Sequence, residues 1–409
     1  MRELRVSLQF PDPVEVGVLA EDDRGRIYFE FAQSFLDAGH AISPYALPAR
    51  PGLLAHQAKP GVPLPGVFSD SRPDGWGLRL LHRRFADAGR PRSQVTPFDE
   101  LAFLGQRAMG ALAYEPTTGP DTLFEAVELG SLAAHALDVY TGHTTETLPA
   151  LVRAGGSPGG VRPKALIGRR GDEVCIGEAE LPEGFSHWLV KFPRPEDDPD
   201  AARREAAWMA LARRAGLVVA DCEVLELGTG VGDAFATRRF DRTPDRRHLL
   251  SAAGALNVDF QTAHADYHDL GRLCALLCRG DQSQVARLVR LATFNVVARN
   301  EDDHLKNLAW LYDGERWALS PAYDLTYAPH ASGHRHTAVL GRTQQISREH
   351  LLELGKELGL RPAVARTMLE EVLEALADVE SVLATFGCTH PVSKTAAADV
   401  LRQVDRIAR

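Results

Sequence analysis

The feature that most constrains the fold of this chain is an acidic loop between an apolar helix pattern and a predicted β-hairpin. Apolar residues at helical spacing predict a helix just before the loop, and these are Val285, Leu288, Val289, Ala292 and Val296. The loop, residues 300–307, reads Asn-Glu-Asp-Asp-His-Leu-Lys-Asn. Two short strands are predicted at 308–312 and 317–319, and Asp324 follows them. One hairpin therefore separates two acid-bearing loops and brings both to one edge of the structure.

Asp302 and Asn307 in this loop have a spacing that suits phosphoryl transfer. They lie five residues apart, like the base and the metal-binding asparagine of a protein-kinase catalytic loop. An acceptor hydroxyl needs a carboxylate within hydrogen-bond reach, and an amide oxygen can hold Mg²⁺ against phosphates. Asp324 stands where the second, metal-chelating aspartate of such an enzyme belongs.

Two other interpretations of these acidic residues are open. Aspartates in loops more often cap helices and turns than carry out chemistry. Asp302, Asp303 and His304 could instead belong to a metal hydrolase, but the sequence offers no evident second ligand cluster with the right spacing. Two acid-bearing loops at one edge favour phosphoryl transfer.

A second signal is a glycine-rich loop, residues 155–164, that opens into a predicted strand. It reads Gly-Gly-Ser-Pro-Gly-Gly-Val-Arg-Pro-Lys, so four glycines surround Ser157. Such a backbone can approach phosphates closely. The loop is neither a Walker A motif nor a eukaryotic kinase loop, and by itself it is equally typical of a flexible turn.

Lysine is rare in this chain, and a retained lysine indicates a need for a compact ammonium group. The three that lie beside the motifs are Lys164, Lys191 and Lys306. Lys191 lies in a predicted buried strand, where an ammonium needs an anionic partner such as a phosphate. Glu205, in an alanine-rich helix predicted near 199–215, can supply the glutamate of a Lys–Glu pair. The alternative is a lysine that reaches water and a glutamate on a solvated helix face, but the catalytic loop favours the pair.

The order of the predicted elements indicates an α+β, protein-kinase-like two-lobed fold with an N-terminal β-rich subdomain and a mostly helical C-terminal lobe. Four segments are predicted: a subdomain at 1–115, a linker and helix at 116–150, a small lobe at 151–245 and a helical lobe at 246–409. The first segment opens with strands near 4–10, 15–19 and 27–31, and the last closes with helices near 346–359, 363–386 and 392–408.

Six motifs follow one another along nearly the whole chain: Phe68–Gly77 with its Pro-Asp-Gly-Trp-Gly ending, Gly155–Lys164, Val190–Phe192, Arg239–Arg242, Asp302–Asn307 and Tyr323–Asp324. In this combination the chain resembles the HipA family of toxin kinases. The resemblance implies a kinase-like fold that uses ATP and Mg²⁺. It implies that Asp302 is the general base and that Asn307 and Asp324 bind Mg²⁺.

The resemblance also implies where the nucleotide lies. Lys191 and the loop around Gly159 and Gly160 would contact the phosphates of ATP, and main chain near Arg238 and Phe240 would meet the adenine. The other residues expected at the nucleotide are Ser157, Lys164, Glu205, His304 and Lys306.

Ser157 matches the serine that kinases of this family autophosphorylate. In the family this phosphorylation ejects the phosphate-binding loop and shuts the enzyme off, because a phosphoserine places negative charge where the phosphates of the nucleotide lie. Pro158 follows directly, and the loop is richer in glycine and arginine than in some relatives, so this chain departs from the family pattern here.

The implied function is that of a serine/threonine-protein kinase toxin of a type II toxin–antitoxin system. Members of the family phosphorylate a serine of an aminoacyl-tRNA synthetase, of which glutamyl-tRNA synthetase is the best-known target, and are bound by a small HipB-like helix-turn-helix antitoxin. The net charge of −9 argues against a broad nucleic-acid surface, so DNA contact is expected only through the antitoxin.

Two alternative functions remain. A small-molecule kinase on the same fold would need the same base and metal ligands, although the N-terminal subdomain favours the toxin. A decayed kinase fold could serve as a scaffold or co-repressor, but intact Asp302, Asn307, Asp324 and Lys191 argue against it.

Other features of the sequence bear on location and surface. No long apolar run and no signal peptide are evident, so we expect a cytoplasmic protein with no membrane contact. The cysteines lack zinc-ligand spacing, and Cys274 and Cys278 are predicted to be core thiols. The pairs Arg238-Arg239 and Arg246-Arg247 are predicted to be solvated charge rather than partner contacts.

Overall fold

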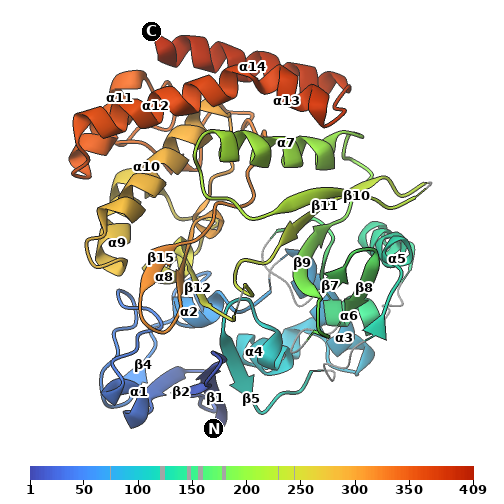
Figure 1. The fold of residues 1–409 in the computed structure, drawn as a ribbon. Helices are drawn as coiled ribbons and strands as arrows, with labels where there is room; N and C mark the ends of the chain where they lie inside the picture. The colour runs from blue at the N-terminus through green and yellow to red at the C-terminus, as the bar shows by residue number, and fades with distance from the viewer. Residues whose placement is uncertain are drawn as a thin grey trace. The chain divides into compact units, whose positions relative to one another are not determined.

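A computed structural model provides the fold (Figure 1). It describes residues 1–73, 75–119, 125–144, 149–154, 160–176, 181–228, 230–243 and 245–409. The chain divides into two compact units. Unit 1 contains residues 1–195, 225–259 and 311–315, and unit 2 contains residues 196–224, 260–310 and 316–409. The four segment boundaries predicted from the sequence stay predictions.

Unit 1 begins with a five-stranded sheet of order β4-β3-β2-β1-β5. Its strands are β1 (Arg2–Leu8), β2 (Val14–Glu21), β3 (Ile27–Phe31), β4 (Leu54–Ala55) and β5 (Leu112–Glu115). Leu4, Val6 and Leu8 of β1 alternate with exposed residues and are buried, as expected for a strand with one face on the core. The three N-terminal strands predicted from the sequence are confirmed.

A second sheet, which belongs to unit 1 except for residues 222–224 of its edge strand β10, has the order β10-β11-β9-β7-β8-β6. Its strands are β6 (Glu125–Ala126), β7 (Lys164–Arg170), β8 (Glu173–Ile176), β9 (Ser186–Lys191), β10 (Cys222–Glu226) and β11 (Asp233–Arg238). A buried cluster joins Ala165, Val190 and Ala236 of this sheet to Trp76, Leu132 and Leu151 of three helices. This packing fixes the strands that carry the two lysines predicted to bind phosphate.

The remaining elements of unit 1 are α1 (Gln33–Asp37), α2 (Gly66–Ser69), α3 (Gly75–Asp87), η1 (Arg92–Gln94), α4 (Pro97–Leu104), η2 (Gly105–Arg107), α5 (Leu129–Thr141), α6 (Pro149–Ala154), β12 (His248–Ser251) and α8 (Ala252–Leu256). Helix α4 was not predicted, although the residues at its start are typical of a helix N-terminus. Thr96 and Asp99 form a capping box there, and Pro97 occupies the first turn.

Unit 2 is mostly helical (Figure 1). It contains α7 (Ala201–Arg214), β13 (Ala265–Asp266), α9 (Tyr267–Leu277), α10 (Gln282–Val297), η3 (Leu305–Asn307), β15 (Trp317–Leu319), β16 (Thr337–Ala338), α11 (Arg348–Glu357), α12 (Pro362–Ala377), α13 (Val379–Thr385), α14 (Pro391–Ala408) and the first half of β14 (Ala309–Tyr312). The apolar stripe of α10 is buried, and the Trp208 indole of α7 donates a hydrogen bond to the Ala298 carbonyl at its end.

The prediction of a single helix at 363–386 is wrong, because two helices occupy that stretch. Asp378 ends α12 and begins α13, with φ −86° and ψ 10°. Aspartate is a weak former of helix interiors, since its side chain competes for backbone groups. The predicted hairpin strands and the predicted helices near 346–359 and 392–408 are confirmed.

All five cysteines are free thiols, and Cys274 and Cys278 are buried as predicted. Within the described part of the chain, no helix is both long and apolar enough to cross a membrane.

Candidate active site

The predicted catalytic loop starts at the end of α10, where the chain is tightly anchored. Arg299 turns the backbone with a positive φ of 58°. The Asn300 main-chain N–H then donates to the Asn295 carbonyl at 3.0 Å, and the Asn300 side chain donates to Asn295 Oδ1 at 3.0 Å. Asn300 is buried, so these bonds fix the point at which the acidic loop leaves the helix.

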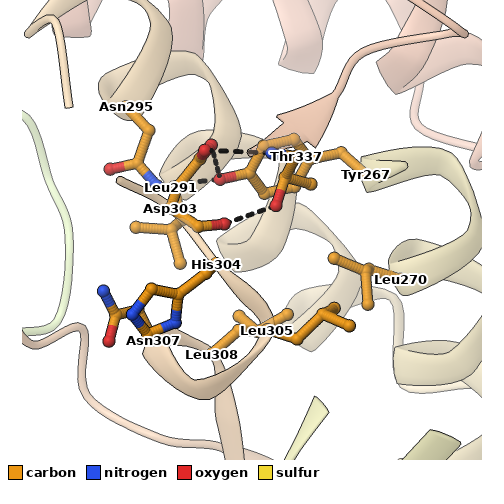
Figure 2. A pocket seen from close by; sticks show the side chains of 10 residues that line it. All are labelled: Tyr267, Leu270, Leu291, Asn295, Asp303, His304, Leu305, Asn307, Leu308 and Thr337. Atoms are coloured by element: carbon orange, nitrogen blue, oxygen red, sulfur yellow. Dashed lines mark hydrogen bonds between the residues drawn. The ribbon is translucent and has the colours of Figure 1, made fainter. Parts of the chain in front are cut away.

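Asp303 anchors the middle of the loop (Figure 2). Its carboxylate accepts hydrogen bonds from the Tyr267 hydroxyl at 2.8 Å, from the Thr337 main-chain N–H at 3.1 Å and from the Arg335 guanidinium at 2.6 Å. Asn295 donates in turn to the Tyr267 hydroxyl at 2.8 Å. Asp303 and Arg335 are both buried, so every oxygen of this carboxylate is used for structure.

Asp302, the neighbouring residue, faces the other way. Its side chain is 57% exposed, and Oδ1 lies 3.4 Å from Nε2 of His336. Partial loss of water raises the pKa of Asp302, and the negative charge of Asp324 raises it further, while His304 and His336 lower it. A carboxylate with a raised pKa is a stronger base than an ordinary aspartate, which suits general-base chemistry.

Asn307 and Asp324 come to the same place from the two ends of the β14–β15 hairpin. The Asn307 side-chain amide donates to the Asp302 carbonyl at 3.0 Å, which turns its amide oxygen away from that carbonyl. The Tyr323 hydroxyl donates to the Lys306 carbonyl at 2.5 Å and ties the second loop to the first. Asp324 has a φ of 56°, a left-handed conformation that is uncommon outside functional sites and turns.

The chemistry of these oxygen donors fits Mg²⁺. An amide oxygen and a carboxylate are hard ligands, and kinases complete the coordination with phosphate oxygens. Among the residues that the structure describes, no three His, Cys, Asp or Glu side chains are grouped to hold a metal ion. One amide oxygen and one carboxylate would leave the other positions of a magnesium shell to phosphate oxygens and water.

His304 and Lys306 lie on the same loop as Asp302. The Lys306 main-chain N–H donates to His304 Nδ1 at 3.3 Å. Both side chains contact Phe260: the His304 ring lies 5.2 Å from the phenyl ring, and Lys306 Nζ lies 5.0 Å from its centroid. The structure thus brings together five of the predicted residues, Asp302, His304, Lys306, Asn307 and Asp324, on two connected loops of unit 2.

A second group of predicted residues lies in unit 1. Lys164 of β7 and Lys191 of β9 are directly opposite one another in an antiparallel register, so their side chains share one face of the sheet. Gly160 adjoins them, because a Cβ at this residue would lie 3.0 Å from Lys164 Nζ. The register therefore places two positive charges on one face of the sheet, and Lys164 is buried. Ser157 and Gly159 lie outside the described residues.

The start of α3 holds the end of the glycine-rich loop. The Trp76 main-chain N–H donates to the Gly160 carbonyl at 3.1 Å, and the Trp76 indole donates to the Lys164 carbonyl at 3.0 Å. A Cβ at Gly75 would lie only 2.3 Å from the Gly160 carbonyl oxygen. This positioning role of Trp76 was not predicted from the Pro-Asp-Gly-Trp-Gly motif, which served only to mark the family resemblance. Asp74 of the motif lies outside the described residues.

Arg238 and Phe240, predicted to lie near the adenine, are at the end of β11, where Arg238 pairs with Trp188 of β9. The prediction that Arg239 is solvated is wrong. Its guanidinium is buried and lies 2.8 Å from the carboxylate of buried Asp241. The counter-charge two residues along the chain makes this burial tolerable.

Glu205 is buried in α7 and does not lie on a solvated helix face. Lys191 and Glu205 belong to different units, so their pairing stays a prediction.

The sheets, the helical unit and the two acid-bearing loops define a protein with an α+β, two-lobed kinase-like fold, as predicted. A solved structure with this fold is the complex of HipA, HipB and operator DNA from the Shewanella oneidensis MR-1 toxin–antitoxin system. The likeness has a TM-score of 0.75 and covers 99% of this chain and 97% of that chain at 19% identity. Residues 10–115 match the model of the HipA N-terminal domain, and residues 156–379 match that of the HipA-like C-terminal domain. The chain belongs to the HipA family.

Two relatives that match this chain carry the word kinase in their names. “Putative kinase Y4dM” of Sinorhizobium fredii is 27% identical over 384 residues, which cover 88% of this chain and 87% of that protein. The serine/threonine-protein kinase toxin HipA of Shewanella oneidensis is 24% identical over 259 residues, which cover 57% of each chain.

Proposed function

We propose that this chain is an ATP- and Mg²⁺-dependent serine/threonine-protein kinase with Asp302 as its base. One observation carries the proposal: Asp302, Asn307 and Asp324 lie on two loops that the Tyr323–Lys306 hydrogen bond joins. The names of the relatives support the same reaction class.

In this proposal each residue has one task. Asp302 accepts the proton of a serine hydroxyl, aided by its raised pKa. Asn307 and Asp324 hold Mg²⁺, which, when bound, neutralises charge on the phosphates. Lys164, Lys191 and the main chain at Gly160 orient the phosphates, and main chain near Arg238 and Phe240 holds the adenine.

We further propose that the acceptor is a protein serine, in an aminoacyl-tRNA synthetase and at Ser157 of the chain itself, as expected for a toxin of a type II toxin–antitoxin system. The solved relative is a complex with HipB and operator DNA, which supports a HipB-like antitoxin as partner. A net charge of −9 supports DNA contact through that partner rather than through this chain.

The test compares wild type, Asp302→Asn and a control, Asp269→Asn, which removes an exposed carboxylate of α9. Each full-length protein is incubated with Mg-ATP, and phosphate on Ser157 is read by mass spectrometry. We expect phosphate on wild type and the control and none on Asp302→Asn. Bound ATP without phosphate on any protein would favour a small-molecule kinase or a scaffold, and no ATP binding at all would refute the kinase proposal.

A further inference from the structure

The stretch His330–Thr337, here called the histidine segment, runs beside the catalytic loop. The His336 main-chain N–H donates to the Glu301 carbonyl at 3.0 Å. The His330 main-chain N–H donates to the Glu301 side chain at 2.7 Å. The segment ends in the first residue of β16, Thr337, and the backbone bends at His336, directly before this strand.

Two neighbouring residues of the segment meet the two neighbouring aspartates of the loop. Arg335 is buried and contacts Asp303 at 2.6 Å, whereas the next residue, His336, is exposed and lies 3.4 Å from Asp302. A buried anchor and an exposed contact thus stand next to each other in the chain.

The inward contact fixes the segment firmly. Besides its ion pair with Asp303, the Arg335 guanidinium donates to the Asn300 carbonyl at 3.2 Å and to the Thr337 carbonyl at 2.9 Å. The Asp303 carboxylate also accepts a hydrogen bond from the Tyr267 hydroxyl (Figure 2). Because the anchor is buried and multiply bonded, the backbone of His336 has little freedom to move away from Asp302.

The ring of His336 also has two aromatic neighbours. The centroids of the His304 and His330 rings lie 6.1 and 6.0 Å from its own, with nearly perpendicular planes. The charged or titratable side chains that act electrostatically on Asp302 include His304 and Asp303 of its own loop, Asp324 of the second loop and His336.

We propose that His336 is a positioning residue for the catalytic base, holding the Asp302 carboxylate in the orientation that receives the serine proton. This inference rests on the proposed function. An exposed carboxylate rotates freely about its side-chain bonds, and an imidazole nitrogen at ion-pair distance favours one rotamer. A base held in place reacts faster without binding ATP more tightly.

The test uses three full-length variants in Mg-ATP turnover, read as phosphate on the chain and as ADP released. His336→Phe keeps the ring and removes its nitrogens, and His336→Gln keeps an N–H donor. His334→Gln is the control, because His334 is exposed on the same segment and lies 2.6 Å from Thr343 rather than beside Asp302. We expect His336→Phe to lower kcat by roughly tenfold to a hundredfold with KM for ATP unchanged. The Gln variant should regain part of that loss, and the control should match wild type.

The outcomes separate the inference from the function beneath it. Equal kcat for wild type and His336→Phe would overturn the positioning role and leave the kinase proposal intact. A parallel loss in His336→Phe and His336→Gln, with a lower Tm in both, would assign His336 to folding and also overturn the role. If wild type turns over no ATP, the proposed function fails and the role fails with it.

Discussion

Two adjacent aspartates of the catalytic loop have opposite environments. Asp303 is buried and accepts bonds from Tyr267, Arg335 and Thr337, so it serves as an anchor. Asp302 is 57% exposed and has a raised pKa, so its carboxylate is available as a base. The proposed base thus stands next to a residue whose carboxylate is fully engaged in structural hydrogen bonds.

At the residue scale, the raised pKa of Asp302 predicts a stability cost. A carboxyl whose pKa is higher in the folded than in the unfolded chain makes the folded state less stable as pH rises. The loss takes place between the ordinary pKa of about 3.9 and the raised pKa. Asp302→Asn should therefore raise Tm slightly at pH 7, without Mg²⁺, and the difference should vanish below about pH 3.9. Thermal unfolding over this pH range is the measurement, with Asp269→Asn as control. A lower Tm for Asp302→Asn at pH 7 would contradict the prediction.

At the scale of elements, the start of α3 and the end of the glycine-rich loop act as one structure. Trp76 bonds to the main chain at Gly160 and Lys164, and Gly75 allows the close approach. The element that carries the N-terminal motif therefore supports the strand that carries Lys164. Stability and nucleotide binding should respond together to changes here.

Gly75→Ala and Gly89→Ala separate these effects. Both glycines have positive φ, 43° and 80°, so alanine at either costs about 1–2 kcal/mol of folding stability. Nothing lies within 4 Å of a Cβ at Gly89, whereas at Gly75 it would collide with Gly160. Of the two variants, we expect only Gly75→Ala to weaken ATP binding. Its Kd for Mg-ATP should rise roughly tenfold, which corresponds to about 1.4 kcal/mol. Calorimetric titration with Mg-ATP measures this, and equal affinities would refute the coupling.

At the scale of the whole molecule, a buried ion cluster joins distant parts of unit 1. Asp241 pairs with Arg239 and Arg242 at 2.8 Å each and accepts the Gly110 main-chain N–H at 2.8 Å. Arg242 also donates to the Ala108 carbonyl at 3.0 Å. Although burial alone would raise it, the two guanidinium groups hold the pKa of Asp241 well below its usual range.

Removal of this charge should destabilise the chain strongly. Asp241→Asn removes the negative charge that pairs with two buried arginines, which costs about 3–5 kcal/mol of folding stability. Asp245→Asn, an exposed change in the same stretch, should stay within about 0.5 kcal/mol of wild type. Urea unfolding at pH 7 compares the two, and equal midpoints would show that the cluster contributes no net stability.

Most elements were predictable from the sequence because their signals are local. The apolar stripe of α10, the strands β1 to β3 and the hairpin after Asn307 follow from periodicity and turn residues. The break at Asp378 was missed because the apolar pattern continues through it. The sequence signal near Arg335 and His336 was a cluster of histidines at 330, 334 and 336. The spacing of these histidines did not indicate which residues they contact.

The sequence by itself determined the local part of the candidate site: the Asp302–Asn307 spacing, the hairpin that follows it and Asp324 at its end. Only the tertiary structure decided which aspartate is buried, that His336 faces Asp302, that Trp76 bonds to Gly160 and that Arg239 is not solvated. The physical reason is distance along the chain. Spacing and periodicity encode contacts within a helical turn, a strand pair or a hairpin, whereas these contacts, apart from the burial of Arg239 by its near neighbour, join residues that only packing brings together.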